Sequence, residues 1–308
     1  MKYTTSILVI IFNRPEKTRK IIEAIEKFKP PRVYVFADGA RNSGEKEICI
    51  KTRNEIKNIN WECEVFTNFQ DDNLGCKIAV STAINWFFEN ENEGIILEDD
   101  CLPSKEFYEF CSLMLDKYRS NSEIGSITGT KISPFNRNYN NKYFASKYPN
   151  VWGWATWKRV WDRYDVELKN WESEWEESSV DSYLDNSSVA EFWRKIFYSV
   201  YGGEVDTWDY QLIFLFLKNR YKCIVPNKNL IENIGFDEEA THTIKNGWIS
   251  SRKIENFTLD DDLLSNSYLE LNRHYDFSLE KFAFGIHRLN LFQRLFRVIY
   301  SKIVFYFD

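Results

Sequence analysis

The chain has 308 residues, of which 44% are hydrophobic and 17% aromatic, enough to bury one large core. Its formal net charge of −6 excludes broad nucleic-acid binding, because such an acidic chain has no basic surplus to hold phosphates, although a nucleotide ligand stays open. The six cysteines form no Cys-x-x-Cys pair, which predicts neither a zinc site nor a disulfide framework and fits a reducing compartment.

The first apolar run covers residues 7–12 and ends at Asn13. It is too short for a signal peptide or a membrane span. We therefore expect a cytoplasmic protein.

Strand-like and helix-like patterns alternate over the first hundred residues, which predicts an α/β fold with a mixed, mainly parallel sheet flanked by helices. The predicted strands are residues 7–12, 33–37, 62–66, 94–98 and 124–128. The predicted helices begin at Pro15, Gly44, near Asn73 and near Pro103.

Three consecutive acids, Glu98, Asp99 and Asp100, follow an apolar strand directly. Adjacent carboxylates repel one another and resist loss of water, so a cation is expected among them. Hard oxygen ligands at the carboxyl end of a central strand suit Mg²⁺ or Mn²⁺. The alternative is an ordinary acidic loop in which Asp100 caps the helix that starts near Pro103.

Beyond residue 133 the periodicity degrades, and polar and aromatic residues crowd together up to residue 205. Irregular aromatic segments are usual where a binding surface is built. A helix is predicted from Asp206 onward, followed by a last strand at residues 221–225. The stretch from 277 to 307 mixes aromatic and aliphatic residues with basic ones. It predicts an interfacial helix on a membrane surface, or a helix docked on its own domain or on a second subunit of a homodimer.

Four features together resemble the GT-A type of nucleotide-diphospho-sugar glycosyltransferase, near glycosyltransferase family 2, over roughly residues 5–245. They are a first strand followed by Asn13-Arg14-Pro15, a second strand ending at Asp38, the helix start Asn73-x-Gly75, and Glu98-Asp99-Asp100. The acidic segment and Trp208-Asp209 are similar to parts of the GlcNAc transferase that initiates complex N-glycans. The bias toward Asn, Lys and Ile indicates a bacterial source, and the overall pattern resembles bacterial enzymes of surface-polysaccharide synthesis.

The resemblance implies a catalytic domain over residues 1–270, with a nucleotide-sugar half at 1–130, an acceptor half at 131–270 and a tail at 271–308. It implies a UDP-sugar donor, a glycan or lipid-linked acceptor, and Mn²⁺ or Mg²⁺ held by Asp100 and His242. The donor-binding residues that it implies are Asn13, Arg14, Asp38, Gly75, Lys77, Glu98 and Asp99.

Inversion at the anomeric carbon needs a carboxylate that accepts the proton of the acceptor hydroxyl. Asp209 is the predicted base, because a helix N-terminus keeps it ionised. The competing explanation is local: Asp206 is an N-cap and Asp209 the third helical residue. Sugar or acceptor contacts are predicted for Trp152, Gly153, Trp154 and Asp206, with core packing as the alternative for the tryptophans.

Three other functions are alternatives to an inverting transferase. A sugar-nucleotide pyrophosphorylase would need a Gly-rich, Arg-containing loop after the first strand, and Asn13-Arg14-Pro15 argues against it. A non-catalytic protein that binds a nucleotide sugar, or that scaffolds a polysaccharide assembly complex, predicts binding without turnover. A retaining transferase is separated poorly from an inverting one by sequence.

Overall fold

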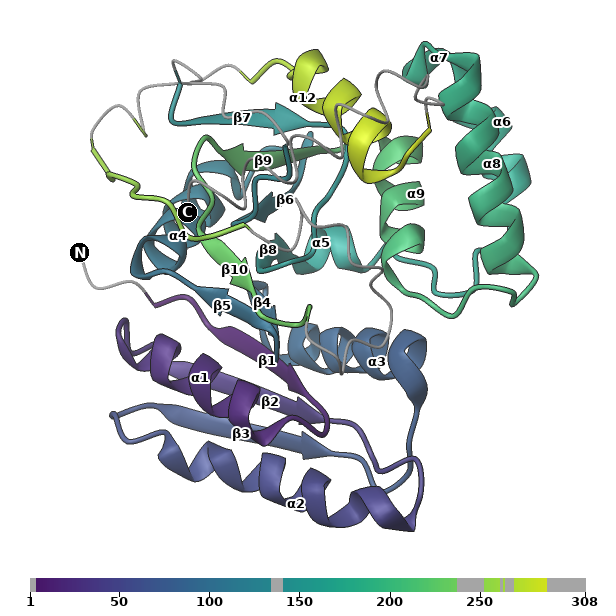
Figure 1. The fold of residues 1–308 in the computed structure, drawn as a ribbon. Helices are drawn as coiled ribbons and strands as arrows, with labels where there is room; N and C mark the ends of the chain where they lie inside the picture. The colour runs from purple at the N-terminus through teal and green to yellow at the C-terminus, as the bar shows by residue number, and fades with distance from the viewer. Residues whose placement is uncertain (1–3, 134–140, 237–251, 261–262, 264–268, 287–308) are drawn as a thin grey trace, which may run out of the picture.

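An eight-stranded sheet runs through the computed structural model, which describes residues 4–133, 141–236, 252–260, 263 and 269–286 (Figure 1). The strand order is β3-β2-β1-β4-β8-β6-β9-β7. Only β8 and β7 run antiparallel to the other strands of this sheet. The strands are β1 (Ile7–Ile11), β2 (Arg32–Ala37), β3 (Glu64–Phe69), β4 (Glu93–Glu98), β6 (Ile124–Thr128), β7 (Tyr143–Ser146), β8 (Trp154–Trp157) and β9 (Lys222–Pro226). The predicted α/β, mainly parallel sheet is confirmed.

Helices flank the parallel strands as the alternating pattern predicts. They are α1 (Pro15–Glu26), η1 (Ser43–Glu45), α2 (Lys46–Asn54), η2 (Glu55–Asn58), α3 (Gly75–Asn90) and α4 (Lys105–Tyr118). The third strand begins two residues later than predicted, and the helix predicted at residues 44–59 is three successive helical segments. The hydroxyl of Ser104 caps α4 by accepting the Phe107 N–H at 3.2 Å, so the alternative in which Asp100 is the cap is wrong.

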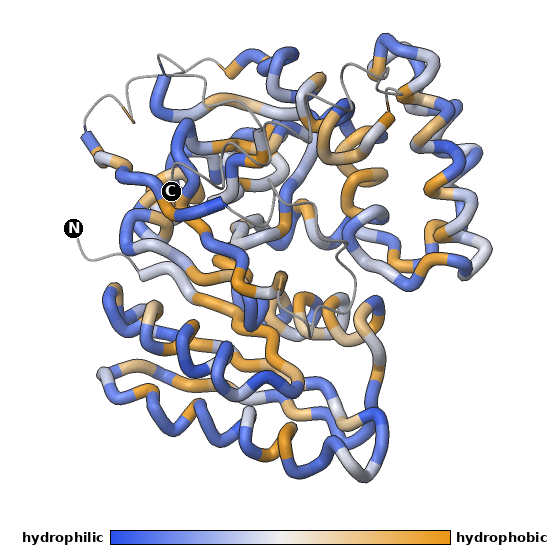
Figure 2. Tube along the Cα trace, in the orientation of Figure 1, coloured by the Kyte–Doolittle hydropathy of each residue, from blue (hydrophilic) through white to orange (hydrophobic). Residues whose placement is uncertain are grey.

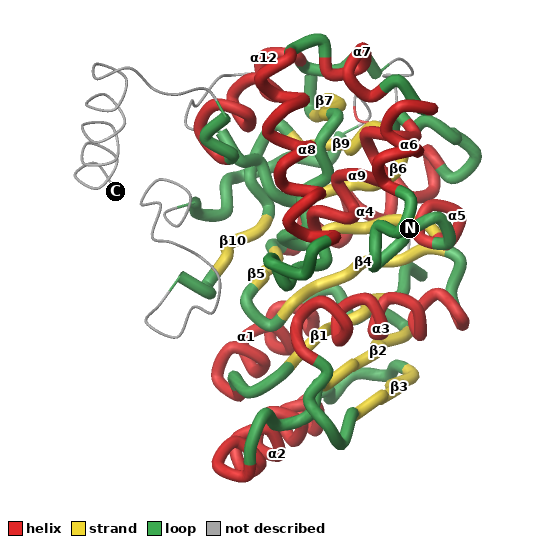
Figure 3. Tube along the Cα trace, turned by 90° about the vertical axis from the view of Figure 1, so that its right-hand side faces the viewer, coloured by secondary structure: helices red, strands yellow, loops and turns green. Residues whose placement is uncertain are grey.

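The segment without periodicity, residues 141–205, is largely helical beyond its two strands. Its helices are α5 (Lys158–Trp161), α6 (Trp171–Glu177), α7 (Val180–Leu184) and α8 (Ser187–Tyr201), and α9 (Asp209–Asn219) follows. Figure 3 shows α8 beside α9. Large buried rings join these helices, since Trp193 stacks on Phe197 at 5.6 Å and Phe197 meets Phe214 of α9 at 5.1 Å.

A small second sheet pairs β5 (Cys101–Pro103) with β10 (Ile231–Asn233) in antiparallel register. It brings the chain near residue 233 back to the acidic segment. Further along, α12 (Arg273–Ser278) and a π-helical turn, η3 (Leu279–Ala283), dock on β7 and the residues after it. There Ser146 donates to buried Asp276 at 2.6 Å, and Tyr148 donates to buried Glu280 at 2.8 Å.

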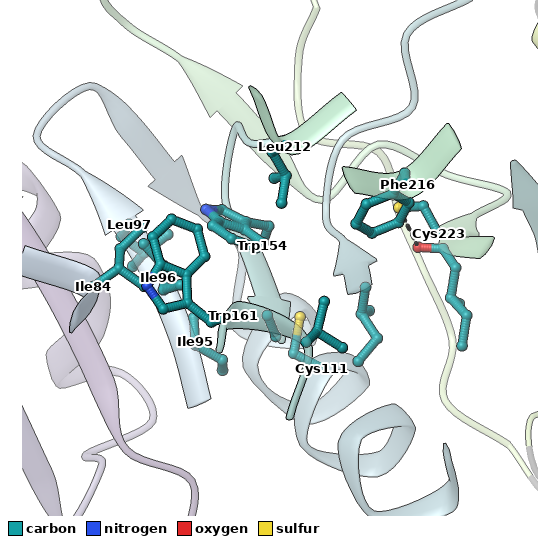
Figure 4. Close-up of a cluster of buried hydrophobic side chains, with 14 of the residues drawn as sticks. Ile84, Ile95, Ile96, Leu97, Cys111, Trp154, Trp161, Leu212, Phe216 and Cys223 are labelled. Carbon is teal, nitrogen blue, oxygen red and sulfur yellow. Dashed lines mark hydrogen bonds between the residues drawn. The ribbon is translucent and has the colours of Figure 1, made fainter. Parts of the chain in front are cut away.

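The core joins both halves of the sheet. Figure 2 shows hydrophobic residues concentrated along the central strands, and all five residues of β1 are buried. In Figure 4, Ile95, Ile96 and Leu97 of β4 lie with Trp154, Trp161 and Leu212 in one buried cluster. The predicted burial of both faces of β4 is confirmed. No helix in the described part of the chain is long and apolar enough to cross a membrane.

Candidate functional site

The predicted site residues gather at one edge of the sheet. Strands β1, β2 and β4 are parallel, so Arg14, Asp38 and the acids after β4 all emerge at the carboxyl edge. Strand β8 is antiparallel and begins at this edge, because its Trp154 pairs with Ile96 of β4. Topology alone therefore brings four separate chain segments to one place.

A guanidinium lies between two of the three acids. Arg14 Nη1 is 3.1 Å from Asp99 Oδ1 and 3.4 Å from Asp100 Oδ2. The side chains differ in exposure, at 8% for Asp99 and 22% for Asp100. Burial raises the pKa of Asp99 to about 6, with Arg14 acting against the rise, and burial together with Asp100 raises the pKa of Glu98. Asp100 is therefore the more accessible carboxylate of this bridged pair.

Asp38 accepts hydrogen bonds from the start of α3. Its carboxylate receives the backbone N–H groups of Leu74 at 2.8 Å and Gly75 at 3.2 Å, and the side-chain amide of Asn73 at 2.8 Å. Gly39 lies so close to the next loop that an added Cβ would be 2.3 Å from the backbone of Asp72. The carboxylate thus satisfies N–H groups that have no partner inside the helix and fixes the place of α3.

The starts of α3 and α9 face each other. Burial raises the pKa of the Cys76 thiol to about 12, and Glu98, Asp209 and Asp206 follow as the next causes. Asp206 also approaches Gly75, since its Oδ2 would be 3.8 Å from a Cβ added there. The acids of β4 and of the α9 start therefore share one neighbourhood around Cys76.

The start of α9 does not have the capping-box arrangement that was the alternative to catalysis. Trp208 is the N-cap residue and Asp209 is the first helical residue. Asp206 is therefore not an N-cap, and Asp209 is not the third residue of a capping box. Instead, the hydroxyl of Thr207 donates to the Asp209 carboxylate.

The tryptophans of the site divide by exposure. Trp154 is 1% exposed and stacks on Trp208, with ring centres 5.8 Å apart, and Trp157 is 2% exposed. Trp152 is partly exposed and packs edge-on against Phe236 at 5.5 Å. Of these three tryptophans, Trp152 therefore offers the most ring surface to a ligand.

Gly153 adopts a left-handed backbone, with φ +64°, and a Cβ there would be 2.4 Å from Ile231 Cδ1. Its carbonyl accepts the N–H of Gly129, at 2.8 Å. Gly153 is therefore required by close packing against β10.

The remaining predicted residues have specific partners or lie elsewhere. Lys77 Nζ is 3.4 Å from Glu167 Oε1, and the Asn13 amide donates to Glu45 at 3.3 Å. His242 lies outside the described residues, as does the part of the tail from 287 to 308. Their assigned roles stay predictions.

Three neighbours of the acids escaped the sequence analysis. A Cβ on Gly235 would be 2.3 Å from Asp100 Oδ2, and the N–H of Ile234 donates to the Asp100 carbonyl at 2.8 Å. Lys17, 8% exposed, acts on Asp99 and lowers its pKa against the effect of burial. A lysine three residues after Arg14 was a usable signal, whereas nothing in the sequence puts residue 235 beside residue 100.

The donor set suits a divalent cation that arrives with a ligand. In the described segments, no group of three or more His, Cys, Asp or Glu residues is arranged to hold a metal ion. Mg²⁺ commonly uses one or two carboxylates and completes its shell with water and phosphate oxygens. Partly exposed Asp100 offers such a carboxylate, and Arg14 already occupies the position of a cation beside it.

A cavity of about 760 Å³ lies at the opposite, amino edge of the sheet. Its charged lining is already paired, as in Arg32 with Glu91 and Arg119 with Glu93. It also lacks the acids that converge at the carboxyl edge. We therefore assign the candidate site to the carboxyl edge rather than to this cavity.

Comparisons with known proteins leave the family open. No protein-family model and no curated protein matches the sequence. HddC from Yersinia pseudotuberculosis aligns over 52% of this chain and 80% of its own, with 10% identity and a TM-score of 0.34. An apo UDP-glucose pyrophosphorylase aligns over 71% and 90%, with 11% identity and a TM-score of 0.36. The 4-diphosphocytidyl-2C-methyl-D-erythritol synthase of Anaerococcus prevotii aligns over 72% and 88%, with 12% identity and a TM-score of 0.34. Similarity at this level identifies neither a family nor an activity.

Proposed function

We propose that this protein is an inverting glycosyltransferase that moves a sugar from a UDP-sugar to a glycan or lipid-linked glycan acceptor. One observation carries the proposal: Glu98, which adjoins Asp99 and Asp100, lies near Asp206 and Asp209 of the α9 start, around Gly75 and Cys76. The reaction needs these two groups of acids on two sides of one sugar. The first handles the leaving diphosphate, and the second handles the attacking hydroxyl.

The donor half of the site is the edge formed by β1, β2 and β4. Asp100 would hold Mn²⁺ or Mg²⁺ together with the diphosphate, and the cation would neutralise the charge that grows on the departing UDP. Asp99 and Glu98 are the more buried acids of the segment, and burial raises the pKa of both, which leaves Asp100 as the carboxylate for the cation. Asp38 fixes the start of α3, which borders the nucleotide side.

The acceptor half is the start of α9. Asp209 would take the proton of the acceptor hydroxyl while that oxygen bonds to the anomeric carbon and the bond to the diphosphate breaks. The hydroxyl of Thr207 holds the Asp209 carboxylate, and the N-terminus of the helix favours its charged form. Partly exposed Trp152 would stack on a sugar ring at the same edge.

The biological setting is proposed on composition and on the resemblance. The bias toward Asn, Lys and Ile indicates a bacterial source, and the resemblance implies surface-polysaccharide synthesis. Within the basic, aromatic stretch of residues 277–307, the part up to residue 286 docks on the domain itself. The remaining residues would hold the enzyme at the inner face of the plasma membrane, where lipid-linked acceptors are made.

The test is UDP release from a panel of UDP-sugars, with and without glycan acceptors, in Mn²⁺, Mg²⁺ or EDTA. We expect metal-dependent release from one donor, lost in Asp100→Ala and strongly reduced in Asp209→Asn. Exposed Glu89 on α3 provides the matched control, because Glu89→Gln removes a charge away from the site. UDP-sugar binding by calorimetry without turnover, whatever acceptor is supplied, would instead favour a non-catalytic binding protein.

A further inference from the structure

The bridge between Arg14 and the two acids has a consequence for ligand binding. One nitrogen of Arg14 contacts both Asp99, at 3.1 Å, and Asp100, at 3.4 Å. The Arg14 side chain is 17% exposed, so much of this contact is shielded from water and is screened less by salt. A divalent cation on Asp100 would face this positive charge at close range, and the two would repel each other.

The backbone of Arg14 is fixed by α1, whereas its side chain takes no part in capping that helix. Arg14 is the N-cap residue of α1, directly before Pro15, and its carbonyl accepts the N–H of Thr18 at 3.0 Å. Its side chain makes no capping bond to the helix. A change of partner therefore needs rotation of the side chain and leaves α1 in place.

If Arg14 moved away, Asp99 and Asp100 would differ in the cations that stay close to them. The positive charge of Lys17 also lowers the pKa of Asp99, and Lys17 is buried one helical turn further along α1. Asp100 is the more exposed and, within the part of the chain that the structure describes, pairs with no cation other than Arg14, although Cys101 Sγ lies 3.4 Å from its Oδ1. Departure of Arg14 would thus leave Asp99 beside a cation and open Asp100 to a metal ion.

We infer that Arg14 occupies the cation position of Asp100 in the donor-free protein and moves to the diphosphate when the divalent cation and nucleotide bind together. The inference rests on the proposed function and adds a regulation of its site. Arginine binds phosphate oxygens as readily as carboxylates, so the diphosphate gives Arg14 a new partner. Metal ion and nucleotide then bind cooperatively, because each removes an obstacle to the other.

The test measures Mn²⁺ binding by electron paramagnetic resonance, with and without UDP, in the full-length protein. In the wild type we expect weak binding of Mn²⁺ alone and strong enhancement by UDP. Arg14→Met should bind Mn²⁺ alone roughly tenfold more tightly and lose roughly tenfold of the enhancement, a coupling of ordinary size. Arg14→Lys retains a cation near Asp99, so it should still bind Mn²⁺ alone as weakly as the wild type.

Arg19→Met is the matched control, since Arg19 lies on the same helix, 46% exposed, and pairs with Glu16. It should leave both Mn²⁺ affinities unchanged. The inference is overturned if a folded Arg14→Met or Arg14→Lys variant does not show the Mn²⁺ affinities expected of it. The proposed function stands in that case, provided that the wild type binds Mn²⁺ with UDP. If the wild type binds no Mn²⁺ even with UDP, both are overturned.

Discussion

The two halves of the large sheet contribute to the candidate site by different means. In the half formed by β3, β2, β1 and β4, the acids follow directly after strands, as Asp38 follows β2 and Asp99 and Asp100 follow β4. In the other half, Asp209 starts a helix whose neighbours are α6, α7 and α8. Hydrogen-bonded strand register places the first set of acids, and side-chain packing places the second.

The difference shows which parts of such a site depend on packing. A carboxylate at a strand end is positioned by the hydrogen bonds of the sheet, which do not depend on side-chain identity. Asp209 follows Trp208, which stacks on Trp154, and the Trp208 carbonyl accepts the hydroxyl of Tyr164 at 2.9 Å. Changes in aromatic packing should therefore disturb the acceptor side of the site more than the donor side.

The largest expected effect tests the role of the acceptor side. If Asp209 is the base, Asp209→Asn should lower turnover roughly 10²-fold to 10⁴-fold, because the amide cannot accept the acceptor proton. The protein should stay folded, since Asn can still accept from Thr207. UDP release under saturating donor, together with a thermal melt, measures both.

The matched variant is Asp206→Asn, three residues earlier and in the same neighbourhood of Cys76. It should cost much less turnover than Asp209→Asn. A larger loss in Asp206→Asn would make Asp206 the base. Equally small losses in both variants would show that neither residue is the base.

A second prediction tests the contact between β8 and β10. Gly153→Ala must accept a left-handed backbone and a Cβ 2.4 Å from Ile231 Cδ1, so we expect a loss of about 2–4 kcal/mol in the free energy of unfolding. Gly203 has φ +76° and no atom within 4 Å of an added Cβ, so Gly203→Ala should lose only about 1–2 kcal/mol. Urea denaturation of both variants separates the cost of the left-handed backbone, which both share, from the cost of the contact with Ile231, which only Gly153→Ala makes. Equal losses would mean that Ile231 moves aside freely.

The first half of the fold followed from the sequence. Alternation of buried strands and amphipathic helices predicted β1, β2, β4 and α1 within about two residues, since each strand is buried on both faces. The same pattern put the acids at the carboxyl edge. What it could not reveal is the partner of those acids, because Arg14 and Asp99 are 85 residues apart and meet only in the folded sheet.

The helices α6, α7 and α8 were not predicted. In α8, Val189, Trp193, Phe197 and Val200 recur at helical spacing and are buried, so the sequence carried a signal that the analysis missed. The other two, α6 and α7, have only seven and five residues, too few for helical periodicity to be recognised. The placement of Gly235 against Asp100 also depends on the pairing of β10 with β5, which spans about 130 residues.

A third prediction concerns pH and the docking of α12. Burial raises the pKa of Asp276 from 3.8 to about 7, opposed by Ser146 and Lys147 and assisted by Glu280. An acid with a higher pKa in the folded protein binds its proton more tightly when folded. Its contribution to the free energy of unfolding is therefore greatest below about pH 4 and is lost as the pH rises through about 7.

We expect the free energy of unfolding of the wild type to fall by about 2–3 kcal/mol more than that of Asp276→Asn between pH 5 and pH 8. Other buried acids, such as Asp99, act in the same direction in both proteins and cancel in the difference. Urea denaturation at several pH values measures it. Parallel pH profiles would show that Asp276 stays charged in the folded protein.

The smallest expected effect is the loss of a helix N-cap, tested on one helix that the sequence predicted and on one that it did not. Ser104 caps α4, and Asn186 caps α8 by accepting the N–H groups of Ser188 at 3.0 Å and Val189 at 3.3 Å. Ser104→Ala and Asn186→Ala should each lose about 1 kcal/mol in urea denaturation, and Asn186→Asp should retain the bond and most of the stability. A loss at Ser104 with none at Asn186 would mean that buried rings such as Trp193 hold the start of α8 without its cap. The half of the sheet that carries Asp209 would then depend on aromatic packing more fully than its hydrogen bonds indicate.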